Sequence, residues 1–364
     1  MKERFSTVAV VRSNNRRGAV AEALALISHE IAEINSEVMV LPDLGATRSR
    51  WAWTRPDTLS ATLDALFSVG ANRAVIHASN FRDLDRSQLR LETFGRPVHY
   101  PSDSVENEHS IWKRVKLDLD EGVSMMVRDI KPRSLVSIAT MKTDGTSTVG
   151  FSLANLLNLI HPDDRFVLGL NQPKIDKLLR SGWIKVRGRA RRFWDSMNTK
   201  DDLEAWRRLN PRAISLLQAA ERTAHLIATL ANSVRPVVSL VDGFKAMHRE
   251  GPDGGEAVDL GVIIAGVDPV AVDAVSAAIM GFDPAKILHL RHANAEGIGQ
   301  VNLEAITIVG DSLESVRKRC IPHSNQRVLK HSWRLPGLIP LPNRGSIVPP
   351  THARPVRSVD PSRR

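Results

Sequence analysis

Three aspartates in the last folded third of the sequence have the residue type and spacing that acid/base or metal chemistry needs. Asp242 follows the β-branched run 237–241, Asp268 lies just beyond the apolar run 260–265, and Asp273 comes five residues later. Ligands of open α/β sheets gather where strands end and helices begin, so we expect the three carboxylates to face one crevice. There they can bind a hard divalent cation through oxygen, or act as general acid and base if burial separates their pKa values.

The same aspartates also have structural interpretations. Asp268 stands directly before Pro269, which is the pattern of a helix N-cap with proline in the first turn. Asp273 lies among valines and alanines, and a buried acid needs a partner, so it is either paired structurally or functional. At the level of sequence both interpretations stay open.

Other polar residues follow predicted strands or lie in a glycine-rich segment. Asp43 and Lys142 each follow a strand-like run, and a lysine at such a place can orient an anionic group. Asp242 leads into a segment that contains Gly251 and Gly255, and glycines let a backbone approach phosphate or carboxylate closely. The segment lacks the Gly-Lys-Ser/Thr ending of a P-loop. We expect it to form a loop that closes over a ligand.

The elements that must position these residues alternate between strand and helix patterns. Strands are predicted by short β-branched or apolar runs, at residues 6–11, 37–41, 74–77, 134–139, 237–241, 260–265 and 305–309. Helices are predicted by amphipathic or capped segments, at residues 18–34, 56–70, 148–157, 202–230, 270–280 and 285–291. This order predicts an α/β fold, with a mainly parallel sheet covered by helices. The middle is less regular, with a hairpin arm near 111–119 and an inserted subdomain near 160–235.

The formal net charge of +10 comes from one end of the chain. Residues 317–364 contain eleven Lys or Arg, one acid and eight prolines, so residues 1–316 are neutral. We expect 1–316 to form a single α/β domain and 317–364 to be a disordered basic tail that touches anionic partners weakly. The neutral folded part has no electrostatic footprint for nucleic acid, so nucleic-acid binding is not expected.

Several classes of function lack their signature. The single cysteine, Cys320, cannot form an intrachain disulfide, and an iron–sulfur cluster is not expected. No apolar stretch approaches the roughly 20 residues of a membrane span, and no signal peptide is seen, so we expect a cytoplasmic protein without membrane contact. Neither a dinucleotide fingerprint nor a serine-hydrolase elbow is present. His289, His292 and Glu296 form only a weak metal spacing.

An ordered series of motifs in the C-terminal third resembles a known family. The stretches VSLVDG at 238–243, LGVI at 260–263 and DPVAVDA at 268–274 are similar to the core of the family catalogued as domain of unknown function 362. Weaker matches are MKTD at 141–144 and LANL at 153–156. Many relatives carry ferredoxin-like cysteine motifs, which this chain lacks. The resemblance therefore implies a fold and a crevice, and it does not imply an iron–sulfur role.

The resemblance also selects individual positions. Those that carry over are Lys142, Asn155, Asp242, Gly251, Asp268 and Asp273. Within this set we expect Asn155 and Gly251, together with Gly255, to contact a cofactor or ligand. Asp144 replaces a histidine of the family pattern and Ala154 replaces a lysine, so anion-binding chemistry shared with the family is weakened.

Three hypotheses of function follow. The first is an enzyme, an oxidoreductase or isomerase, acting on a small anionic or carbonyl substrate. Lys142, Asp242 and Asp273 would be catalytic, and Asp242, Asp268 and Asp273 would hold a divalent cation. The second is a non-catalytic binding or accessory protein with a degenerated site, which the replacement at Asp144 supports. The third is a nucleic-acid partner recruited through the basic tail.

Overall fold

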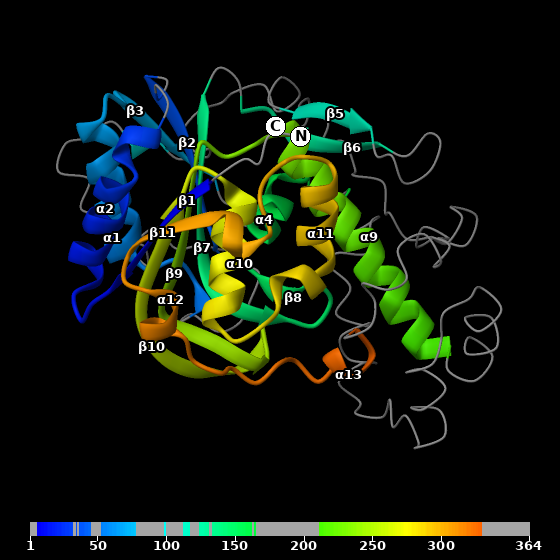
Figure 1. Cartoon of the computed structure of the whole chain (residues 1–364). Helices are drawn as coiled ribbons and strands as arrows, with labels where there is room; N and C mark the ends of the chain where they lie inside the picture. The colour runs from blue at the N-terminus through cyan, green and yellow to red at the C-terminus, as the bar shows by residue number, and fades with distance from the viewer. Residues whose placement is uncertain are drawn as a thin grey trace, which may run out of the picture.

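The computed structural model describes residues 6–31, 34, 36–44, 52–77, 98–99, 112–116, 124–130, 133–161, 164 and 211–329. A nine-stranded sheet lies at the centre of this part of the chain (Figure 1). Its strands lie in the order β11 (Ile306–Gly310), β1 (Ser6–Arg12), β10 (Gly254–Gly266), β9 (Val238–Glu250), β7 (Ser134–Asp144), β2 (Glu37–Pro42), β3 (Arg73–Ile76) and β4 (Val98–His99). The short β8 (Thr148–Gly150) pairs with β7 outside this order. A separate two-stranded sheet pairs β5 (Trp112–Lys116) with β6 (Ser124–Arg128).

The central sheet is mixed and mainly parallel, which confirms the predicted α/β class. Strands β1, β2, β3, β4, β7, β9 and β11 share one direction. Only β10 and β8 run the other way within the described sheet. β9 and β10 form one long antiparallel hairpin, whereas we expected two separate parallel strands. A parallel connection needs a crossover of a dozen residues or more, and only 251–253 join these two strands.

Helices cover both faces of the sheet (Figure 1). On one face lie α1 (Arg16–Leu26) and α2 (Pro56–Ser68). The other face is covered by α4 (Ser152–Asn155), α9 (Pro211–Ser233), α10 (Pro269–Ile279) and α11 (Leu288–Ala295). β1 shows how one strand serves both layers: Val8 and Val10 pack toward α10, while Ala9 and Val11 pack toward α1. Helix α10 is buried along its whole length, which explains why its sequence is apolar on every side apart from Asp273 and Ser276.

Short elements connect these layers. They are η1 (Ser28–Glu30), η6 (Leu156–Leu159), η7 (Pro284–Lys286), η8 (Leu303–Ala305), α12 (Leu313–Val316) and α13 (Gln326–Leu329). The predicted helix at 148–157 is β8 followed by α4. Its start is a turn, because Asp144 Oδ1 accepts hydrogen bonds from the backbone N–H groups of Thr146 and Ser147, at 2.8 and 2.7 Å. None of the described helices has both the length and the apolarity needed to span a bilayer.

The folded part of the chain extends further than the predicted boundary at residue 316. Cys320, Val328 and Leu329 are buried, and the backbone N–H of Arg249 donates to the Ile321 carbonyl at 2.8 Å. The first residues of the expected tail therefore pack against the end of β9. Residues 330–364, and most of the insertion expected near 160–235, lie outside the described residues.

Candidate functional site

A buried ion pair lies at the carboxyl ends of β2 and β7. Lys142, near the end of β7, pairs with Asp43, the residue that follows β2. Thr140 joins them, since its hydroxyl donates to Asp43 Oδ2 at 2.9 Å and accepts from Lys142 Nζ at 3.0 Å. Lys142 and Asp43 are only 7% and 4% exposed. The pair is therefore held out of water at the edge of the sheet where we expected ligand-binding residues.

Asp242 lies on the neighbouring strand at the same edge. In the β7–β9 register Asp242 is opposite Thr140. Its Oδ2 is 3.1 Å from Nε of Arg16, the first residue of α1, and accepts a 2.5 Å hydrogen bond from Thr58 in the first turn of α2. The N-termini of two helices thus meet β9 at Asp242, beside the end of β2 and Thr140 of β7, while β9 itself continues to Glu250. The edge combines two cations, two carboxylates and the positive ends of two helix dipoles.

Asn155 also lies at this edge, where its amide is bound to the backbone. Its Nδ2 donates to the Leu41 carbonyl at 2.8 Å, and its Oδ1 accepts from Asn158 Nδ2 at 2.9 Å. The ring of His77, which directly follows β3, lies 3.3 Å from the Asn158 carbonyl. Asn155 therefore fastens α4 to β2. His77 was not predicted as a site residue, because the strand was expected to run through it to residue 77, whereas β3 ends at Ile76.

Asp268 lies at the opposite edge of the sheet. Because β10 runs antiparallel to its neighbours, its last residue, Gly266, lies opposite Ser239 near the start of β9. The carboxylate is an N-cap: Oδ1 accepts from the backbone N–H groups of Val270 and Ala271 at 2.9 and 3.1 Å. Its Oδ2 accepts from the Ser6 hydroxyl at 2.6 Å and from the Gln300 N–H at 2.9 Å.

Asp273 caps a different helix. Its two oxygens accept hydrogen bonds from the backbone N–H groups of Ser152 and Leu153, at 3.0 and 2.9 Å, at the start of α4. Burial raises the pKa of Asp273 to about 8, and the charge of Asp268 adds to this, while the two hydrogen bonds oppose it. The prediction that Asp242, Asp268 and Asp273 share one crevice and one cation is therefore wrong. Each has its own donors, and Asp268 and Asp242 lie at opposite edges.

Gly251 and Gly255 belong to a tight hairpin and not to a ligand-covering loop. A Cβ at Gly251 would lie 2.3 Å from the carbonyl oxygen of Thr143, and one at Gly255 would lie 2.3 Å from Cγ of Met247. Close packing at the β9–β10 turn accounts for both glycines. The contact with β7 places Gly251 next to the residue that follows Lys142. A direct ligand contact from Gly251, Gly255 or Asn155 stays a prediction.

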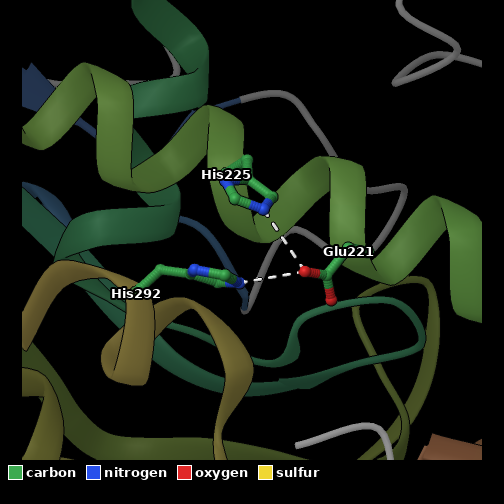
Figure 2. A group of neighbouring side chains, drawn as sticks. All are labelled: Glu221, His225 and His292. Atoms are coloured by element: carbon green, nitrogen blue, oxygen red, sulfur yellow. Dashed lines mark hydrogen bonds and ion pairs between the residues drawn. The ribbon is translucent and has the colours of Figure 1, made fainter. Parts of the chain in front are cut away.

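A second cluster of ligating side chains lies between α9 and α11 (Figure 2). Glu221 and His225 are one turn apart on α9, and His292 comes from α11. Glu221 Oε1 lies 3.3 Å from His225 Nε2 and 3.2 Å from His292 Nε2. These three ligand atoms all lie within 4.8 Å of one another. The group has the composition of a metal site, with two imidazoles and one carboxylate.

Glu221 is the buried centre of this cluster. It is 2% exposed, and its second oxygen, Oε2, has no hydrogen-bond partner in the described part of the chain. Burial alone would raise the pKa of Glu221, but hydrogen bonds from His225 and His292, and the charge of the two rings, lower it to about 2. The carboxylate is therefore ionised at neutral pH, which is the form that binds a cation.

Sequence reasoning found only one member of this cluster. Of the weak spacing formed by His289, His292 and Glu296, only His292 takes part. Glu296 is exposed, and His289 is fully buried, which lowers its pKa to about 4 against the opposing charge of Asp144. The signal that was missed is the Glu-x-x-x-His spacing of Glu221 and His225 on one predicted helix.

The sequence was compared with models of known protein families, and one family model matches it. The model of the family described as Domain of unknown function (DUF362) matches residues 38–278, about two thirds of the sequence. The chain belongs to the DUF362 family. No curated protein and no solved structure matches it. The DUF362 match contains Lys142, Asp242, Glu221 and His225, whereas His292 lies beyond its end. The Glu221 cluster is thus completed by a segment outside the matched DUF362 region.

Proposed function

We propose that this DUF362 member is an enzyme that acts on a small molecule with an anionic or carbonyl group, bound where β2 ends, beside Lys142 of β7 and Asp242 of β9. The observation that carries the proposal is the presence of two buried or half-buried ion pairs, Lys142–Asp43 and Arg16–Asp242, on neighbouring strands. Buried ion pairs seldom stabilise a fold better than apolar residues of similar size. Buried charges cluster instead at functional sites. The two ion pairs of this protein lie at the edge where α/β sheets bind ligands.

The residues of this edge suit proton transfer beside a polarised carbonyl. A lysine ammonium has three N–H donors. In the described part of the chain two of the donors of Lys142 are used, one by Asp43 and one by Thr140. The third can bind a substrate oxygen. Asp242 would then act as the acid or base, with Arg16 and Thr58 fixing its orientation. An isomerisation needs no more than this set. An oxidoreductase would also need a cofactor, for which Asn155, Gly251 and Gly255 were the predicted contacts.

One observation favours a binding protein without catalysis. The family's histidine position holds Asp144, whose Oδ1 is engaged by the backbone N–H groups of its own turn and by the Ser147 hydroxyl at 3.0 Å. A proton-transfer group at that position is thereby replaced by a turn-forming one. A ligand would still bind to Lys142 at the same edge, but it would not be transformed.

A ligand screen with matched variants tests the site. The full chain is melted in the presence of small carboxylates, phosphates and keto acids, as wild type and as Lys142→Met. Lys245→Met is the control, because Lys245 is on β9 but its side chain is 49% exposed and paired with an exposed Asp259. We expect some compounds to raise the melting temperature of wild type and control but not of Lys142→Met. Equal shifts in all three proteins would refute the site.

Solvent isotope exchange then separates enzyme from binding protein. Each compound that binds is incubated with the protein in D₂O, and deuterium incorporation next to its carbonyl is followed by NMR. We expect incorporation with wild type and none with Asp242→Asn, while the variant still binds the compound. Binding without incorporation in the wild type would favour the non-catalytic alternative.

A further inference from the structure

We propose that Glu221, His225 and His292 bind one divalent first-row transition-metal ion, with Zn²⁺ and Fe²⁺ as the candidates. The site uses none of the residues at the carboxyl edge of the sheet. Two packed helices, α9 and α11, supply all three side chains (Figures 1 and 2). Because regular helices hold the ligands, their positions are fixed by backbone packing and not by loops.

Both histidine nitrogens already stand at the separation from Glu221 Oε1 that coordination requires. Residues four apart on a helix share one face, so Glu221 and His225 point together toward His292. A tetrahedral ion with bonds of about 2.1 Å holds its ligand atoms about 3.4 Å apart. The observed separations of 3.3 Å and 3.2 Å from Glu221 Oε1 match this value. They are longer than the roughly 2.7–2.9 Å of a charge-assisted hydrogen bond.

The unsatisfied oxygen of Glu221 is a second, independent indication of a ligand. Buried carboxylate oxygens in native proteins nearly always accept hydrogen bonds, but Glu221 Oε2 accepts none from the described residues. An ion bound by both oxygens of this carboxylate would supply the missing partner. The rings of His225 and His292 lie close together, with centroids 4.0 Å apart, so that one ion can contact both.

The donor set selects the class of metal. Calcium and magnesium prefer sites made wholly of oxygen, whereas two imidazole nitrogens and one carboxylate suit zinc or ferrous iron. Three protein ligands leave coordination positions open, as in catalytic and unlike structural zinc sites. The His225 side chain is 32% exposed, so solvent and a small molecule can reach the ion from that side. An ion there would supply Lewis acidity to a bound water or carbonyl.

Metal titration of the full-length protein tests the proposal. Untagged protein is stripped with a chelator and titrated calorimetrically with Zn²⁺ in air and with Fe²⁺ without oxygen. We expect one ion per chain, and an affinity at least about tenfold lower for His225→Ala and His292→Ala. The two arms of the titration show which ion binds more tightly. Cobalt substitution should add visible d–d absorption, which is lost in both variants.

Controls separate this site from incidental binding and from the carboxyl edge. His29→Ala removes a histidine whose side chain is 70% exposed, and Asp242→Asn alters the proposed substrate site; both should bind one ion as the wild type does. Glu221→Gln keeps the shape of the side chain but removes its charge, and should weaken binding in a protein that still folds by circular dichroism. The absence of a stoichiometric ion, or equal affinity in all variants, would overturn the proposal. So would loss of the ion in Asp242→Asn.

Discussion

The substitution Asp273→Asn should remove the pH dependence of stability that this buried carboxyl causes. Asp273 is fully buried between α10 and α4, and its oxygens accept hydrogen bonds from the N–H groups of Ser152 and Leu153. Burial raises its pKa to about 8 from an ordinary 3.8, with Asp268 as the charged neighbour that adds to the effect. Between these pH values the folded protein retains a proton that the unfolded chain releases. The contribution to stability is therefore complete below about pH 4 and declines as the pH rises through 8.

The size of the effect follows from the same shift. One pKa unit corresponds to about 1.4 kcal/mol, so the unfolding free energy should fall by on the order of 5 kcal/mol between pH 4 and pH 9. This is a large part of the 5–15 kcal/mol that stabilises an ordinary domain. Asparagine cannot titrate, so the unfolding free energy of Asp273→Asn should not fall with pH through this residue. Asparagine also offers one acceptor oxygen where aspartate offers two, so one backbone N–H of α4 is left unpaired. That loss costs about 1–3 kcal/mol. The two curves should cross, with the variant less stable at pH 5 and more stable at pH 9.

Urea unfolding at a series of pH values, followed by circular dichroism, measures both curves. Asp283→Asn is the matched control, because Asp283 also caps a helical turn but is exposed, and its curve should stay parallel to the wild type. A wild-type stability that is flat between pH 5 and 9 would show that the two amides keep Asp273 ionised. A slope of equal size in Asp273→Asn would assign the pH dependence to other groups. Either result would refute the reasoning.

Three further predictions concern stability. Lys142→Met leaves Asp43 buried without its counter-ion and should lower the unfolding free energy by about 3–5 kcal/mol in urea, most of which the double variant Lys142→Met/Asp43→Leu should restore. Asp268→Ala removes an N-cap and should cost about 2 kcal/mol, with faster amide hydrogen exchange at the start of α10. A chain that ends at residue 329 should melt at a higher temperature than one that ends at 316, since each large buried side chain contributes about 1.5–3 kcal/mol.

Most elements of the fold were predictable because their signals are local. The strands β1, β2 and β3 are short buried runs, β7 and β11 are rich in β-branched residues, and α1, α2 and α10 begin at proline or a capping side chain. What failed was the extent of β9 and β10. The distal half of β9 carries polar residues such as His248 and Glu250, and its sequence resembles a loop although Ala246 and Met247 are buried there. The distal halves of β9 and β10 are strands because they pair with each other, and this pairing produces no alternation of apolar and polar residues in either sequence.

The candidate sites depend even more on contacts between distant segments. Lys142 and Asp43 are 99 residues apart, and His292 and Glu221 are 71 apart. The sequence shows that each of these residues could bind a ligand, but it does not show which distant residue lies beside it. Only the spacing of Glu221 and His225 on one helix was a local signal.

The positions of the three aspartates depend on the direction of β10, which was not predicted. The rule that ligands bind at the carboxyl ends of strands predicts one shared edge for Asp43, Lys142 and Asp242, and the three do lie together there because β2, β7 and β9 are parallel. The rule does not apply to Asp268, because β10 runs antiparallel to the other strands and its carboxyl end therefore lies at the opposite edge of the sheet. The three residues between β9 and β10 are too few for a parallel crossover, so the direction of β10 follows from connection length once both strands are given their full extent. With that correction the rule itself removes Asp268 from the site and retains Lys142 and Asp242 on one edge.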